Sequence, residues 1–127
     1  MGEVARKRKL VPERVLCSTA TRARETLELF AEGAEYQGPI DFLDELYLAE
    51  PGAIVRALRD HGASAERVMV VGHNPGLEGL VANLTAERTD LPTTAFVECT
   101  LPIDHWSDLD LDVAGRLRAI FKPKDDR

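Results

Sequence analysis

A histidine directly follows a short apolar segment in "RVMVVGHNPGLEGLVANL". Val68 to Val71 predict a strand buried on both faces, and His73 comes after it, between Gly72 and the turn residues "NPG". A helix is predicted to begin within this turn, so its free backbone amides and the Asn74 side chain would lie near the imidazole. Such groups can hold a phosphate. A histidine that only caps the helix is the alternative, which the surrounding glycine and proline disfavour.

A second set of polar residues follows another predicted strand, in "RVLCSTATRAR". Ser18 and Thr19 supply hydroxyl groups at the start of a predicted helix, and Arg22 lies one turn into it. Because ligands of an open parallel sheet bind beyond the carboxyl ends of its strands, this set and His73 are expected to form one anion site. Arg22 and Arg24 lie roughly 200° apart around the helix, so periodicity does not decide which one faces the site.

The remaining ionisable candidates carry weaker signals. His61 ends a predicted helix before Gly62, and His105 lies beside a tryptophan in an acidic loop, so both are interpreted as structural. Asp44 and Glu45 follow a predicted strand and are candidates for a general acid, but no spacing singles them out.

The two cysteines do not suggest a metal site. Cys17 and Cys99 each lie in a β-like apolar segment, without a cysteine or histidine at metal-ligand spacing. We interpret them as buried free thiols, which suits a reducing cytoplasm, and we expect neither a metal nor a cofactor.

The elements that must position these residues alternate between strands and helices. Strands are predicted at 14–18, 40–43, 67–73, 93–101 and 115–123, and helices at 19–33, 50–61 and 75–84. The first helix has Ala23, Leu27 and Phe30 on one face, with Ser18 or Thr19 as its cap. This order predicts an α/β domain with a largely parallel sheet.

Composition excludes several classes of function. The 127 residues, 44% of them hydrophobic, predict one domain, residues 1–127. A net charge of −6 does not support nucleic-acid binding, and the basic cluster Arg6 to Lys9 is too short to change this. No apolar segment is long enough to predict a membrane span.

The motifs together resemble the histidine phosphatase superfamily, with its phosphoglycerate-mutase-like fold, and in particular its SixA-type phosphohistidine phosphatases. The similar segments are "VLCSTATRARETLEL", "DELYLAEP", "VMVVGHNPGLEGLVANL" and "PTTAFVECT". The resemblance implies a three-layer α/β/α sandwich in which Arg22, Ser18, His73 and Asn74 bind phosphate. It also implies a metal-independent phosphatase that forms a phosphohistidine intermediate on a phosphohistidine protein or a small phosphoester, with Arg22 and His73 catalytic.

One part of the family pattern is absent. The nucleophile belongs to an Arg-His motif at the end of the family's first strand, and this sequence has no Arg-His pair. Met1 therefore resembles an internal methionine, with on the order of 30 to 45 residues missing, the size of the front of a βαβ unit. A misplaced start codon, a deliberately shortened chain and a pseudoenzyme are the three explanations, of which the first two are favoured.

The missing strand has structural consequences. In the family's strand order, 3-2-4-1-5-6, it lies beside the strand that precedes His73. We expect the gap to be closed by residues 93–101, by Met1 to Leu10 or by another copy of the chain, self-association being favoured. The alternative to a phosphatase is a catalytically silent phospho-ligand binding or interaction module. A nucleotide-binding domain is disfavoured because no glycine-rich phosphate loop is present.

Overall fold

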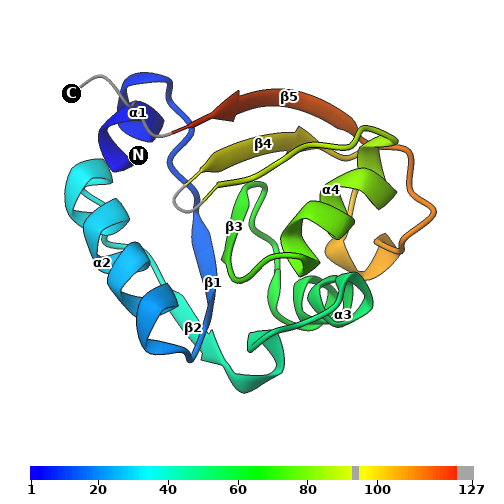
Figure 1. Ribbon diagram of the computed structural model, residues 1–127, viewed down its shortest axis with the longest axis horizontal. Helices are drawn as coiled ribbons and strands as arrows, with labels where there is room; N and C mark the ends of the chain where they lie inside the picture. The colour runs from blue at the N-terminus through cyan, green and yellow to red at the C-terminus, as the bar shows by residue number, and fades with distance from the viewer. Residues whose placement is uncertain (93–94, 123–127) are drawn as a thin grey trace.

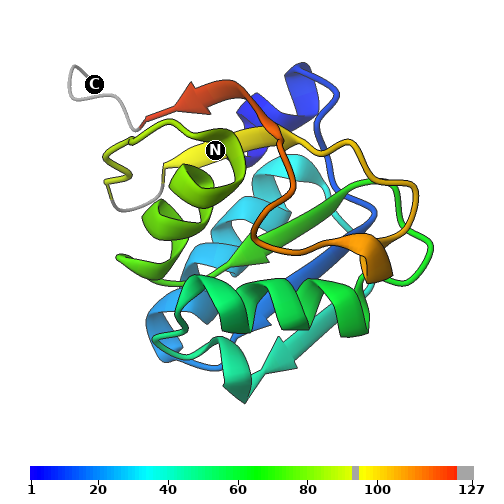
Figure 2. The same cartoon turned by 90° about the vertical axis from the view of Figure 1, so that its right-hand side faces the viewer.

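The computed structural model describes residues 1–92 and 95–122, which form a layered α/β structure (Figure 1). Its elements, in chain order, are α1 (Gly2–Lys7), β1 (Arg14–Ser18), α2 (Thr21–Ala34), β2 (Ile40–Leu43), η1 (Asp44–Leu46), α3 (Pro51–His61), β3 (Val68–Val71), α4 (Gly76–Thr85), β4 (Phe96–Thr100), η2 (Trp106–Asp108) and β5 (Arg116–Phe121). Helix α2 covers one face of the β2-β1-β3 sheet, and α3 and α4 cover the other (Figure 2). The expected α/β/α layering is thus confirmed.

The helices form where the apolar periodicity predicts them. In α2 the residues Ala23, Leu27 and Phe30 are buried, as expected for the inward face. Helix α3 begins at Pro51, a residue suited to the first helical position because it lacks the amide that would find no partner there. The predicted cap of α2 was wrong: Ala20 occupies the N-cap position, and the Ser18 hydroxyl accepts the Ala20 amide just before the helix.

The central sheet is parallel and has the order β2-β1-β3. Register places Cys17 of β1 opposite Val71 of β3, so the residues after both strands emerge at the same edge of the sheet. Strand β1 is buried over nearly all its length. Strand β2 lies at the sheet edge, and there Ile40 and Phe42 are exposed rather than buried.

The expected continuous sheet is divided into two. Strands β4 and β5 form a separate antiparallel pair, and within the described ranges β3 pairs only with β1. The prediction that β3 is buried on both faces was therefore wrong for most of it: only Val71 is buried. The physical reason is that β3 lacks a neighbour on one side. The strands predicted at 93–101 and 115–123 include Thr93, Thr94 and Pro123, and these three residues lie outside the described part of the chain.

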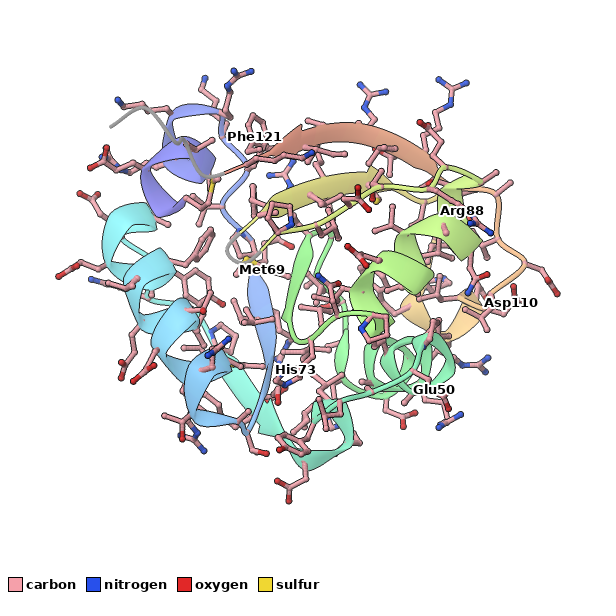
Figure 3. The ribbon with its side chains drawn as sticks, in the orientation of Figure 1. Glu50, Met69, His73, Arg88, Asp110 and Phe121 are labelled. Carbon is pink, nitrogen blue, oxygen red and sulfur yellow. The ribbon has the colours of Figure 1, made fainter. Side chains whose placement is uncertain are left out.

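A cavity of about 1260 Å³ lies along this unpaired side of β3. Its walls include Met69 and Val70 of β3 together with Phe96 and Val97 of β4. Mostly apolar side chains therefore face the space between the two sheets. In Figure 3, Met69 lies on the side of β3 that is nearer to β4, and His73 lies beyond the other end of β3.

The amino-terminal segment does not fill this space as a strand. Helix α1 packs on α2, where Gly2 and Gly33 allow the two backbones to approach closely. Ala5 is buried in a small cluster with Phe30 and Ala34. None of the helices within the described ranges is long and apolar enough to cross a membrane.

Candidate phosphate site

Ser18 and His73 meet at the carboxyl ends of β1 and β3. The His73 Nε2 atom lies 2.9 Å from the Ser18 Oγ atom, and this hydroxyl group also accepts the Ala20 amide. Ser18 is fully buried, with 0% of its surface exposed. A buried hydroxyl group with two partners has a fixed position, so it orients the imidazole toward the cavity that His73 lines.

Of the two arginines near the start of α2, Arg22 lines this cavity and Arg24 does not. The Arg22 side chain lines the same cavity as His73, and no carboxylate within residues 1–92 and 95–122 forms a salt bridge with it. Arg24 lies elsewhere: its guanidinium group stacks 4.2 Å from the centre of the Phe42 ring, and its Nε donates to the Thr19 carbonyl. Between these two arginines, Arg22 is therefore the one whose side chain lines the same cavity as His73.

Asn74 lines the cavity, but its side chain is already engaged. The amide nitrogen donates to the Leu91 carbonyl at 2.6 Å, and the amide oxygen accepts the Glu78 amide. Glu78 in turn accepts the Leu91 amide at 2.7 Å. Two side chains thus hold both backbone groups of Leu91, which fixes the loop after α4 beside the site.

Sequence reasoning missed two residues at this site, Tyr47 and Leu48. The Tyr47 ring makes an edge contact with the His73 imidazole, with centroids 5.6 Å apart and planes at 75°. Leu48 lines the same cavity. Both lie in "DELYLAEP", one of the segments that resemble the histidine phosphatase superfamily, but the sequence analysis assigned neither of them a role.

Among the described residues, none of the weaker candidates forms a hydrogen bond, salt bridge or ring contact with His73. Glu45 is 3.6 Å from His61 Nε2 and, like Asp44, is not among the residues that line the cavity. His105 does line the cavity, but beside Trp106, whose indole donates to Ala65 in the loop before β3. His105 is thus at the amino end of β3, opposite to His73.

The cysteines are protonated and the described residues form no metal cluster. Burial raises the pKa of both the Cys17 and the Cys99 thiol to about 11. In residues 1–92 and 95–122, no group of three or more histidine, cysteine, aspartate or glutamate side chains could hold a metal ion.

Comparisons with known proteins agree with this architecture. No family model matches the chain. An uncharacterized protein of Mycobacterium leprae (strain TN) is 29% identical over 104 residues, and one of Mycobacterium tuberculosis (strain ATCC 25618 / H37Rv) is 31% identical over 109 residues. These matches cover 82% and 76% of this chain, but the chain spans only 61% and 65% of the relatives' length.

Solved structures decide the fold. The structure of the protein histidine phosphatase SixA complexed with tungstate is similar to this chain, with a TM-score of 0.77 and 24% sequence identity. The match covers 95% of this chain and 75% of the SixA chain. The chain has the SixA fold. Proteins assigned as SixA from Nakamurella multipartitia and Agrobacterium tumefaciens match 96% of the chain, with TM-scores of 0.79 and 0.76 and 23% identity each. These two matches cover 79% and 75% of the respective SixA chains. The fold expected from the sequence motifs is therefore confirmed.

Proposed function

We propose that this chain binds the phosphoryl group of a substrate at Arg22, Ser18 and His73, as part of a metal-independent phosphatase of the SixA type. The supporting observation is that Arg22 and His73 line one cavity, and that the Ser18 hydroxyl group contacts the His73 ring at the carboxyl ends of β1 and β3. A guanidinium group binds two phosphoryl oxygens at once, and the imidazole can donate to the charge that develops on them. Tungstate, the ligand of the first SixA structure, is likewise a tetrahedral oxyanion.

The proposed reaction has two steps. A histidine nitrogen attacks phosphorus, and the leaving group departs with the bonding electrons and takes up a proton. Water then attacks the phosphohistidine, which releases inorganic phosphate and restores the histidine. The substrate is a phosphohistidine protein or a small phosphoester, and the two protonated thiols suit a reducing compartment such as the cytoplasm.

The nucleophilic histidine is proposed to come from polypeptide outside residues 1–127, on a strand between β3 and β4. Two observations support this position. Within the described residues β3 has an unpaired edge, and β4 pairs only with β5. The cavity between them is lined mostly by apolar side chains, and His73 is among the residues that line it. A strand placed there would pair with an open edge and bury those side chains.

Anion binding by the 127-residue chain tests the first half of the proposal. Phosphate and tungstate titrations followed by NMR should give saturable shifts around His73. Arg22→Ala and His73→Ala should weaken binding about 10-fold or more, since each removes a charged or donating partner. Arg24→Ala is the matched control, because Arg24 stacks on Phe42 instead. Equal losses for Arg22→Ala and Arg24→Ala would contradict this assignment.

Turnover tests the second half. The chain of residues 1–127 should release no phosphate from a phosphorylated substrate. A longer chain, read from in-frame DNA upstream of Met1 and ending its added strand in Arg-His, should carry an acid-labile phosphoryl group on that histidine. His73→Ala in the longer chain should slow turnover about 10²-fold, as for one lost oxyanion donor. Hydrolysis by the purified 127-residue chain would show that the nucleophile was misassigned.

A catalytically silent phospho-ligand binding module is the second candidate. One observation favours it: His105 lies at the opposite end of β3 from His73, and His61 lies near Glu45, so neither is positioned as a nucleophile at the site. Phosphate binding without turnover, in both the 127-residue and the longer chain, would support this candidate over the phosphatase.

A further inference from the structure

Two large apolar side chains stand exposed at the edge of the phosphate site. Tyr47 and Leu48 are consecutive residues between η1 and α3, and 56% and 65% of their surfaces are exposed. Leu48 lines the cavity that His73 lines, and the Tyr47 ring contacts the imidazole edge-on. Neither side chain contributes to the buried core, so core packing does not explain why large apolar residues occupy this loop.

The backbone at Leu48 is unusual for its residue type. Leu48 has a φ of 50°, in the left-handed region that disfavours residues with a Cβ atom. The other non-glycine residues with positive φ in the described part of the chain are Lys9, Glu35, Ala63 and Ala86, all just after α-helices, where such caps are common. Leu48 likewise follows a helical turn, since η1 ends at Leu46, but it is the one large apolar residue among these five residues of the described chain, and its side chain is exposed.

The loop has a fixed position relative to His73. The Ala49 carbonyl oxygen packs directly against Gly76, the first residue of α4, where a Cβ atom would overlap it. The turn from His73 to Gly76 therefore carries the imidazole at its first residue and packs against Ala49, the residue after Leu48, at its last. The backbone that follows Tyr47 and Leu48 is therefore packed against the same turn that carries the imidazole.

We propose that Tyr47 and Leu48 bind the leaving group of the substrate and select a planar aromatic one. The inference rests on the proposed function, since a phosphoryl group anchored at Arg22 and His73 places its substituent beside these two side chains. An aromatic ring gains from contact with the Tyr47 ring and covers the exposed surface of Leu48. A short alkyl or polyhydroxylated substituent gains little from either.

Binding of two phosphate monoesters to the 127-residue chain tests this selectivity without requiring turnover. Phenyl phosphate and methyl phosphate carry the same phosphate group, so their affinities differ through the substituent alone. Phenyl phosphate should bind about 5- to 10-fold more tightly. Tyr47→Ala and Leu48→Ala should each reduce that ratio toward one. Leu111→Ala, at an exposed leucine that does not line the cavity, is the matched control.

The outcomes separate this inference from the proposed function. Equal binding of both esters would overturn the leaving-group assignment and leave the phosphate site intact. No binding of either ester would overturn both proposals. Leu48→Gly covers the case in which an alanine variant does not fold: glycine adopts positive φ freely, so the thermal midpoint should not fall while the phenyl preference does. Retained preference in this variant would also contradict the assignment.

Discussion

Ser18 and His73 are joined by a hydrogen bond of 2.9 Å between residues 55 positions apart in the chain. The bond exists because β1 and β3 are parallel neighbours, with Cys17 opposite Val71, so the chain leaves both strands at the same edge. The buried serine hydroxyl also binds the Ala20 amide, which connects the start of α2 to the imidazole. One small side chain thus couples both loops of the candidate phosphate site.

Ser18→Ala should damage stability and phosphate binding together. The substitution leaves the Ala20 amide and the His73 nitrogen without their hydrogen-bond partner, which should cost about 1 to 3 kcal/mol in the free energy of unfolding. The imidazole also loses its orienting contact, so phosphate affinity should fall severalfold. Denaturant unfolding and phosphate titration measure the two effects. Ser107→Ala, at an exposed serine, is the control, and equal behaviour of the two variants would contradict a special role for Ser18.

Glu78→Ala should loosen the loop after α4. The carboxylate accepts the Leu91 amide, while Asn74 donates to the Leu91 carbonyl, so both act on one residue. We expect a loss of about 1 to 2 kcal/mol in stability, with faster hydrogen exchange at Leu91. Because the two side chains hold the same residue, the Asn74→Ala/Glu78→Ala double variant should lose less than the sum of the single variants. Strict additivity would show that the two contacts act independently.

Both thiols should react slowly in the folded chain. Burial raises the pKa of Cys17 and Cys99 from 9.0 to about 11, so at pH 9 the thiolate fraction is about 50-fold lower in the folded than in the unfolded state. Iodoacetamide labelling at pH 9, with and without denaturant, measures this difference. The linked stability is fully present below pH 9 and is lost as the pH rises toward 11, because only the unfolded thiols ionise readily in that interval. Equal labelling rates in both states would contradict the prediction.

The sequence predicted the elements better than their assembly. Periodicity located α2 and α3 because their buried residues, such as Leu27 and Ile54, recur at helical spacing. It could not choose between Arg22 and Arg24, since that choice depends on Phe42, a residue on another element that stacks with Arg24. Tyr47 was missed for a similar reason: its contact with His73 follows from Ala49 packing against Gly76, a backbone approach that no local pattern encodes.

The apolar pattern predicted that β3 is buried on both faces, whereas the absence of the family's first strand predicted an open edge beside it, and the structure agrees with the second prediction. Val68 to Val71 read as a strand with neighbours on both sides, yet within the described residues it pairs with β1 alone. Residues 96–100 pair with β5 rather than with β3. The segment that starts at Met1 forms the helix α1, which packs on α2 and does not pair with β3. Two of the three expected ways to close the gap are therefore not used.

The third way, another copy of the chain, gives the last prediction. An unpaired edge beside an apolar cavity favours pairing with a strand from a second molecule. The 127-residue chain should associate as its concentration rises in sedimentation velocity experiments, and hydrogen exchange at Val68 to Val71 should slow in parallel. Strand β2, at the other edge of the same sheet, is the internal control, because its exchange should not change with concentration. A chain that stays monomeric at all concentrations, with β3 exchange as slow as that of β1, would show that the open edge needs no partner.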